Sequence, residues 1–186
     1  MRIMHISLGG CLSAPPVKYG MTEDTGGHIA YVLGAAMAQA KLPEVDEITI
    51  VTRLFDAPEL GAVFAEAEER IAPKCRVVRL ASDRAEYLEK GDLVGELPSL
   101  QNALLETLEQ MGAARPDVIH AHFADAAELA LAARERFGIP VLYTAHSLGA
   151  EKLAPGEVPS VELEARANSA NGVRRRIFLS TSNTIR

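Results

Sequence analysis

The chain has 186 residues, and 48% of them are hydrophobic, which is enough apolar material for one compact domain with a core. Its net charge of −6 argues against a nucleic-acid-binding surface, because the longest basic run is residues 174–176. The apolar run at the N-terminus is interrupted by His5 and is too short for a signal peptide or a membrane span. Cys11 and Cys75 lack the spacing of a metal site, so we expect reduced thiols and a cytoplasmic protein, with a disulfide as the less favoured alternative.

Short β-branched runs alternate with longer amphipathic stretches along the chain. In order, the pattern predicts a strand at 3–8, a helix at 27–40, a strand at 48–52, a helix at 58–72, a strand at 77–80, a helix at 97–113, a strand at 118–121, a helix at 124–136, and strands at 141–144 and 177–181. Irregular connections are predicted at 81–96 and 147–160. The strand runs are apolar throughout, as in a parallel sheet that is buried on both faces. This order predicts an α/β fold with a doubly wound, mainly parallel Rossmann-like sheet of five or six strands, in a single domain over residues 1–186.

The first predicted helix begins with Gly26, Gly27 and His28, although glycine is a poor helix former. Asp24 and Thr25 precede it and are natural N-cap residues. Free N–H groups and the positive end of the helix dipole make an anion site, and glycine lets a phosphate or sugar approach the backbone closely. Alternatively, the glycines only permit a tight turn into the helix. The spacing leaves both interpretations open, and the dinucleotide fingerprint G-x-G-x-x-G is absent.

Further polar residues come directly after the later predicted strands. In open parallel sheets, ligands bind beyond the carboxyl ends of the strands. We therefore expect a crevice at this edge of the sheet, with His28 facing it and with His146 in a functional rather than a structural role. Two motifs lie at the edge, "HAHFAD" and "YTAHSLGAEK", and they contribute His120, His122, Asp125, His146, Ser147 and Lys152.

Several of these residues also have a structural alternative. His120 lies inside a buried strand and is expected to be a hydrogen-bonded core histidine. It shares one strand face with His122, as two metal ligands would, but no third ligand is evident, so no metal site is predicted. Asp125 could simply cap the following helix. Lys90 and Arg84 lie in a charged stretch that is typical of solvated surface.

Three segments together resemble the amino-terminal half of retaining glycosyltransferases of the sucrose-phosphate synthase and sucrose synthase group: "EDTGGHIAYVLGAAMAQA", "PDVIHAHFADAAELA" and "GIPVLYTAHSLGAEK". The resemblance covers residues 1 to 152, with the motifs in the same order and spacing. It implies the amino-terminal domain of a GT-B fold, in which two Rossmann-like domains face each other. The carboxy-terminal nucleotide-sugar-binding domain is then absent from the 186 residues, and a truncated chain of this kind is expected to be inactive alone.

The resemblance also implies roles for single residues. The turn D-x-G-G-Q/H contacts the phosphate of the sugar or of the donor, which assigns that contact to Gly26, Gly27 and His28. The histidine of H-S-L-G contacts the donor sugar near the reacting carbon, so His146 is the candidate catalytic residue, expected to donate a hydrogen bond that strengthens in the transition state. The positions implied to hold the acceptor, mainly through its phosphate, are Lys90, His122, Asp125, Ser147 and Lys152.

The implied reaction transfers a hexosyl group, glucosyl in the simplest case, from a nucleotide sugar such as UDP-glucose to a sugar or sugar phosphate such as fructose 6-phosphate. No cofactor beyond this co-substrate, no metal, no nucleic acid and no membrane partner are expected. The sequence departs from the family at Phe123, which replaces a tyrosine, and at His28, which replaces the commoner glutamine. Two alternatives stay open: a non-catalytic sugar-phosphate-binding module, and another Rossmann-like nucleotide-dependent enzyme such as an epimerase.

Overall fold

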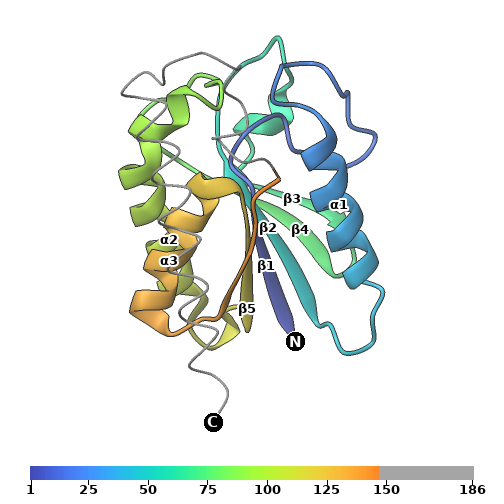
Figure 1. Ribbon diagram of the computed structural model, residues 1–186. Helices are drawn as coiled ribbons and strands as arrows, with labels where there is room; N and C mark the ends of the chain where they lie inside the picture. The colour runs from blue at the N-terminus through green and yellow to red at the C-terminus, as the bar shows by residue number, and fades with distance from the viewer. Residues whose placement is uncertain (147–186) are drawn as a thin grey trace, which may run out of the picture.

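The computed structural model of the chain describes residues 1–146. Strands and helices alternate through most of this region, as Figure 1 shows. The predicted strand at 177–181 and the predicted connection at 147–160 lie outside the described residues. In chain order the elements are β1 (Arg2–Ile6), α1 (Gly27–Gln39), β2 (Glu47–Arg53), the 3-10 helix η1 (Ala62–Ala65), β3 (Glu68–Ala72), β4 (Cys75–Leu80), the 3-10 helix η2 (Asp92–Glu96), α2 (Leu97–Met111), the 3-10 helix η3 (Gly112–Ala114), β5 (Val118–His122), α3 (Phe123–Phe137) and β6 (Val141–Thr144).

The described strands form one sheet in the order β3-β4-β2-β1-β5-β6. All neighbours pair in parallel except β3 and β4, which are antiparallel. Helix α1 covers one face of this sheet, and α2 and α3 pack side by side on the other (Figure 1). This arrangement confirms the doubly wound α/β fold that the sequence predicts. Among the described residues, no helix is long and apolar enough to cross a membrane.

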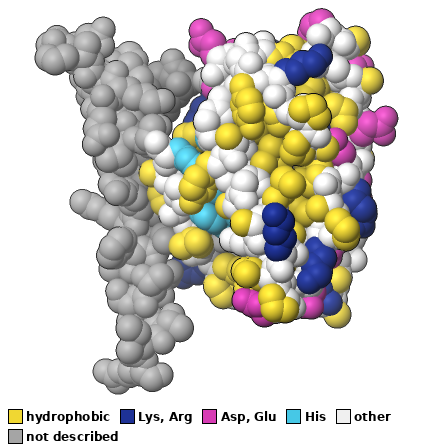
Figure 2. All heavy atoms as spheres, turned by 90° about the vertical axis from the view of Figure 1, so that its right-hand side faces the viewer, with side chains coloured by type: hydrophobic (Ala, Val, Ile, Leu, Met, Phe, Trp, Pro, Cys, Tyr) yellow, Lys and Arg dark blue, Asp and Glu magenta, His cyan; other side chains and the backbone are white. Residues whose placement is uncertain are grey.

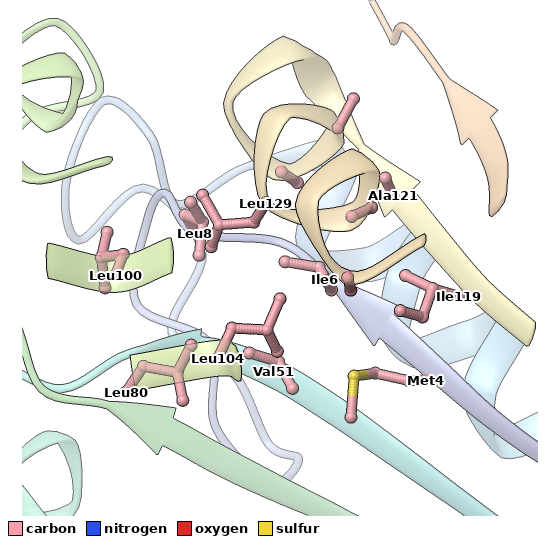
Figure 3. Packing of buried hydrophobic residues seen from close by; sticks show 14 of the residues in the cluster. Met4, Ile6, Leu8, Val51, Leu80, Leu100, Leu104, Ile119, Ala121 and Leu129 are labelled. Carbon is pink, nitrogen blue, oxygen red and sulfur yellow. The ribbon is translucent and has the colours of Figure 1, made fainter. Parts of the chain in front are cut away.

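Each central strand is buried on both faces because its side chains alternate between two cores. Met4 and Ile6 of β1 pack with Leu104 of α2 and Leu129 of α3, the cluster drawn in Figure 3. Ile3 points the other way and packs in the cluster beneath α1. The next residue with the same orientation as Ile3 is His5, so a histidine is buried on the α1 face of the sheet.

The prediction of a helix at 58–72 is wrong. The chain there forms the short 3-10 helix η1 and then β3, which pairs antiparallel with β4. Gly61 has a φ of 138°, a conformation that stops a continuous helix at this point. Glu69 of β3 also pairs with the buried Arg79 of β4 at 2.5 Å, a contact across the hairpin that helix propensity does not anticipate. The other three predicted helices and the five earlier strands are confirmed with small shifts at their ends.

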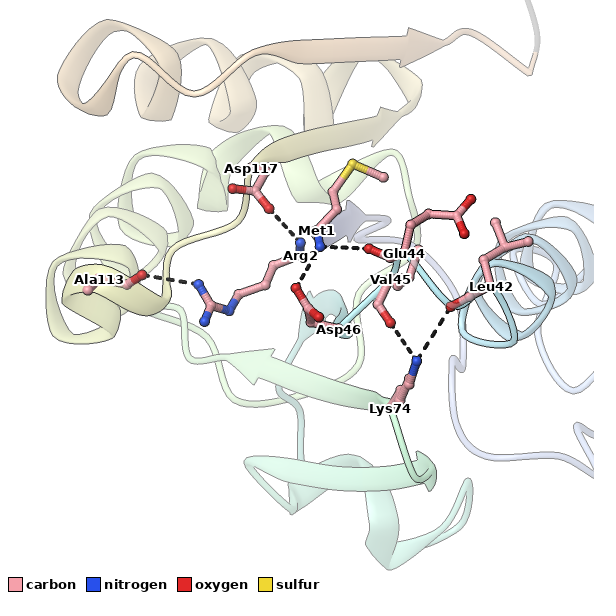
Figure 4. A network of polar contacts seen from close by, with 9 residues as sticks. All are labelled: Met1, Arg2, Leu42, Glu44, Val45, Asp46, Lys74, Ala113 and Asp117. Atoms are coloured by element: carbon pink, nitrogen blue, oxygen red, sulfur yellow. Dashed lines mark hydrogen bonds and ion pairs between the residues drawn. The ribbon is translucent and has the colours of Figure 1, made fainter.

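The amino ends of the strands are held by a network of polar contacts, drawn in Figure 4. The Met1 ammonium donates to Asp46 Oδ2 at 2.6 Å, and this hydrogen bond lowers the pKa of the Asp46 carboxyl. The backbone N–H of Arg2 donates to Asp117 Oδ2, also at 2.6 Å. Lys74 Nζ donates to two backbone carbonyls at 2.6 and 3.4 Å. These contacts tie β1, β2, β4 and β5 together at one edge of the sheet.

Cys11 and Cys75 are both buried free thiols, which confirms the expectation of reduced cysteines. Burial raises the pKa of Cys75 to about 11, so its thiol stays protonated near neutral pH.

Candidate functional site

The carboxyl ends of β1, β5 and β6 lie next to one another, and the start of α1 lies above them. The parallel register sets His5 of β1 opposite His120 of β5, and His122 of β5 opposite Thr144 of β6. Side chains at these positions share the α1 face of the sheet, and Figure 2 shows histidine side chains reaching the surface on this face. The sheet order changes direction between β1 and β5, which is where open α/β sheets bind their ligands.

The glycines at the start of α1 border open space. The helix begins at Gly27, and its N-cap residue Gly26 has an extended backbone and no side-chain cap. A Cβ added to either glycine would meet nothing within 4 Å, and neither has a positive φ. Both line a pocket of about 540 Å³ together with residues of the 19–25 loop. The chain itself does not require glycine here, which favours the interpretation that the glycines leave the backbone open to a ligand.

Asp24 and Thr25 do not cap α1, so that prediction is wrong. The Asp24 carboxylate instead accepts the backbone N–H of Lys90 at 2.5 Å, and the Thr25 hydroxyl accepts the N–H of Cys11 at 2.9 Å. The carbonyl of Asp24 also approaches Gly10 so closely that a Cβ there would lie 2.3 Å from its oxygen, and Gly10 has a φ of +80°. Three loops are thereby held together, and Lys90 is brought to the start of α1.

Phe123 is at the centre of a cluster of cationic and imidazole side chains. The Nζ of Lys90 lies 2.9 Å from the centroid of its ring, and the rings of His28 and His146 lie 5.2 and 4.8 Å from it. Phe123 and His146 have φ values of 71° and 55°, and they are the two non-glycine residues with positive φ in the described part of the chain. Backbone strain of this kind in bulky residues gathers at functional sites. Lys90 is therefore part of the candidate site, whereas Arg84 is exposed and pairs with Glu86.

His28 and His146 face each other across this cluster, with ring centroids 6.5 Å apart. His28 Nε2 donates to the carbonyl of Gly9 at 3.2 Å. Burial lowers the pKa of His28, and Lys90 lowers it further. His146 is exposed, and desolvation, His28 and Lys90 all lower its pKa. Both rings are therefore mainly neutral at pH 7.

His120 is buried, and its Nε2 lies 2.8 Å from Thr144 Oγ1, which confirms the prediction of a hydrogen-bonded core histidine. Burial lowers its pKa to about 4. His122 is fully buried, and burial together with the neighbouring histidines lowers its pKa to about 2. Both therefore stay neutral well below pH 7. The buried His122 is connected to the crevice by its hydrogen bond to His146.

His5 is a further member of this group, one that no sequence motif singled out. One nitrogen from each of His5, His120 and His122 lies within 4.8 Å of the others. The period-two alternation of β1 was the available signal, since it places His5 on the same face as the two later histidines. His5 Nδ1 and His122 Nε2 are 3.0 Å apart, with ring planes 14° apart and centroids separated by 5.3 Å. The two nitrogens thus point at each other rather than at a shared third point, which is the geometry of an N–H···N hydrogen bond.

Asp125 lies in the first turn of α3, and the alternative that it caps this helix is wrong. The N-cap residue is His122, and no side-chain cap bond is present. Asp125 Oδ1 is buried and has no hydrogen-bond partner among the described residues. Burial raises the pKa of this carboxyl, and Lys90 opposes the shift. Ser147 and Lys152 lie outside the described residues.

Comparisons with known proteins cover most of the chain, the residues of this site included. Residues 26–182 match the glycosyl transferase 4-like domain family. The chain is 26% identical to sucrose-phosphate synthase 1 of Arabidopsis thaliana, covering 81% of this chain and 17% of the relative. It is 28% identical to a Solanum tuberosum protein described as a probable sucrose-phosphate synthase, covering 94% and 19%. A solved sucrose-phosphate synthase from Thermosynechococcus elongatus matches with a TM-score of 0.69 at 25% identity, covering 95% of this chain and 39% of that one.

The chain spans about a fifth of the length of the curated relatives that it matches. The family match, in contrast, extends over most of the chain and includes the start of α1, the carboxyl ends of β5 and β6, and the cluster around Phe123. The chain therefore belongs to the glycosyl transferase 4-like domain family.

Proposed function

We propose that this domain is the acceptor-side half of a retaining glycosyltransferase. The reaction transfers a hexosyl group, glucosyl in the simplest case, from a nucleotide sugar such as UDP-glucose to a sugar or sugar phosphate such as fructose 6-phosphate. One observation carries the proposal: the open glycine start of α1, Lys90 and two neutral histidines meet at the carboxyl edge of the sheet. The similarity to sucrose-phosphate synthases supports the choice of substrates.

The crevice is suited to binding the phosphate group of the acceptor. The first N–H groups of α1 and the positive end of its dipole attract an anion, and Gly26 and Gly27 leave room for it beside the backbone. Lys90 adds a full positive charge, which is held near the helix start by the hydrogen bond from its backbone N–H to Asp24. Asp125 Oδ1 is buried without a hydrogen-bond partner among the described residues, and we assign to Asp125 the role of accepting a hydrogen bond from a sugar hydroxyl. Phe123 supplies an apolar surface where the family has a tyrosine hydroxyl.

His146 is the residue that we place against the donor sugar. It is exposed, its backbone is strained, and its ring is held by a hydrogen bond to His122 and by edge contacts with Tyr31 and His28. A contact that strengthens as the reaction proceeds lowers the barrier, and a fixed ring contributes through position.

The proposal places the nucleotide half of the site, where negative charge develops on the leaving diphosphate, in a second domain beyond these 186 residues. On this account the chain by itself binds the acceptor without turnover.

Calorimetric titration tests the acceptor site. We expect fructose 6-phosphate to bind the chain and fructose to bind much more weakly, because the phosphate supplies the main contacts. Lys90→Met keeps an apolar stem over Phe123 but removes the charge, and it should weaken fructose 6-phosphate binding about tenfold. Lys41→Met is the matched control, since Lys41 is exposed just beyond the other end of α1. Equal affinities for the two variants would contradict the proposed phosphate site.

Supplying the nucleotide-binding domain of a related sucrose-phosphate synthase tests the chemistry. With UDP-glucose and fructose 6-phosphate, we expect a product whose new glycosidic bond has the same anomeric configuration as the donor, readable by NMR. Binding of fructose 6-phosphate without any transfer, in a complex shown to form, would instead favour the non-catalytic sugar-phosphate-binding module.

A further inference from the structure

We propose that Gln39, His5 and His122 are positioning residues that fix which ring nitrogen of His146 carries the proton. They do so through a continuous chain of side-chain hydrogen bonds that runs from the last turn of α1 to the crevice. The inference rests on the proposed function in one respect, namely that His146 is the residue that meets the sugar.

Three hydrogen bonds join the four side chains of this hydrogen-bond chain. Gln39 Oε1 lies 2.7 Å from His5 Nε2. His5 Nδ1 lies 3.0 Å from His122 Nε2, and His122 Nδ1 lies 2.9 Å from His146 Nε2. Both nitrogens of His5 and both nitrogens of His122 are thus engaged, so neither ring can change its protonation pattern without its neighbours doing the same.

The direction of the chain follows from its first link. An amide oxygen only accepts, so His5 must carry its proton on Nε2, and in a neutral ring Nδ1 is then an acceptor. His122 must therefore donate from Nε2 to His5, which leaves its own Nδ1 as an acceptor. His146 must in turn donate from Nε2 to His122. By this sequence of steps, His146 Nδ1 carries no proton.

The hydrogen-bond chain requires neutral rings. A protonated imidazolium ring donates from both nitrogens, so it could not accept the hydrogen bond from the next residue. His5 and His122 are fully buried, and burial lowers the pKa of both. His120 stands beside the chain rather than in it, since its Nε2 is held by Thr144 while its ring packs 4.1 Å from the centroid of His122. Tyr31 contacts the rings of both His122 and His146 edge-on and limits their rotation.

The consequence is chemical. His146 presents a lone pair to the crevice, so it accepts a hydrogen bond from a sugar hydroxyl. Contrary to the expectation from the sequence, it does not donate a hydrogen bond to the sugar, and it cannot act as a general acid while the hydrogen-bond chain is intact. A ring nitrogen fixed as an acceptor rejects a carbonyl or ether oxygen at the same place, which gives the crevice a means of orienting the sugar by its hydroxyl groups.

Nitrogen-15 NMR of the chain labelled at its five histidines tests the wild-type arrangement. We expect the proton on Nε2 of His5, His122 and His146 at pH 7. We also expect scalar coupling across the two N–H···N hydrogen bonds. A proton on His146 Nδ1, or no coupling between His122 and His146, would overturn the proposal. This measurement needs no ligand, so its result does not depend on whether the crevice binds a sugar.

A single substitution at Gln39, the far end of the hydrogen-bond chain, provides a sharper test. A histidine can carry its proton on either ring nitrogen, so its partners decide which one it uses. Gln39→Lys replaces the acceptor by a donor, which the helix C-terminus tolerates electrostatically. We expect all three rings to reverse, so that His146 carries its proton on Nδ1. Ala38→Lys adds the same charge to the neighbouring exposed position and should leave every tautomer unchanged. A Gln39→Lys protein in which His5 reverses but His146 does not would disprove the coupling.

Discussion

The two edges of the sheet are formed by the same strands, but the polar groups at the two edges have different surroundings. At the amino edge, the Met1 ammonium, the Arg2 N–H and Lys74 are matched by carboxylates or carbonyls at 2.6 Å. At the carboxyl edge, two residues have strained backbones, a buried carboxylate oxygen lacks a described partner, and a pocket of about 540 Å³ opens beside Gly26 and Gly27. One edge is closed by polar pairs, whereas the other keeps open space beside the start of α1.

The two edges separate the residues that stabilise the fold from those available for binding. In a parallel sheet every strand ends at the same edge, and the helix that follows a strand starts there with its positive dipole end. The carboxyl edge is therefore the place where free backbone donors gather, and strain or unpaired groups there are compensated by the core and by the opposite edge. Substitutions at the two edges should then have different effects, and the following predictions test that contrast.

The largest expected effect concerns His146. In the enzyme completed with a nucleotide-binding domain, His146→Ala should lower kcat about a hundredfold or more, the size expected for losing one well-placed polar group. The variant should still fold, since the side chain is exposed and is not part of either core. Steady-state kinetics and thermal melts of the same preparations measure both effects. A kcat within a few-fold of wild type in a folded variant would remove His146 from the reaction.

The next effect is acid sensitivity, which arises at the carboxyl edge. The pKa values of His120 and His122 are lowered to about 4 and about 2 in the folded chain, below their unfolded value. The folded state therefore binds fewer protons, so its stability is fully present above pH 6.5 and decreases as the pH falls below it. From pH 6.5 to 5.5 each of these histidines should cost about 1 kcal/mol of unfolding free energy.

Urea denaturation at the two pH values measures this loss, and His120→Asn serves as the comparison because it removes one of the two histidines. The variant should lose about 1 kcal/mol less than the wild type between pH 6.5 and 5.5. Identical pH dependence in the two proteins would show that His120 does not contribute to the acid sensitivity.

Two glycines of the carboxyl edge should respond in opposite ways. Gly10→Ala places a Cβ against the Asp24 carbonyl at a φ of +80°, and it should destabilise the fold by about 1–3 kcal/mol. Gly27→Ala meets open space and should leave stability unchanged or raise it by up to about 1 kcal/mol, while weakening fructose 6-phosphate binding. Denaturation curves and titrations of both variants give the answer. A Gly27→Ala protein that binds the ligand normally would mean that the open space there is not part of the site.

The smallest expected effect is at the amino edge. Asp117→Ala removes the acceptor for the Arg2 N–H, but Asp117 is exposed and water can replace it. We expect a loss of about 1 kcal/mol or less in unfolding free energy and no change in ligand affinity. Weaker binding of fructose 6-phosphate by this variant would show that the two edges are coupled rather than separate.

The sequence predicted the elements whose local pattern and tertiary role agree, such as the central strands and the helices α1, α2 and α3. It failed at 58–72, where an alanine- and glutamate-rich stretch has helix propensity, but residues 68–72 form the first strand of an antiparallel hairpin with β4, which follows two residues later. It also assigned Asp24 to the wrong role, because the N–H that this carboxylate accepts belongs to Lys90, 66 residues away.

For the candidate site, the residues that follow strands could be found from the sequence, since parallel strands place their ends together. His122 and His146 are of this kind, and the structure joins them by a hydrogen bond. His5 and Gln39 could not be found in this way, because their importance depends on register between β1 and β5 and on how α1 lies across the sheet. Alternation within β1 gave the face of His5 but not its partner.

The most direct test of the account is a crystal of the chain soaked with fructose 6-phosphate. We predict phosphate density at the start of α1, within hydrogen-bond distance of the backbone N–H groups of the first turn and of Lys90 Nζ. Phosphate density found only beside Lys41 or Lys74, at the opposite edge of the sheet, would contradict the claim that the carboxyl edge is the binding edge.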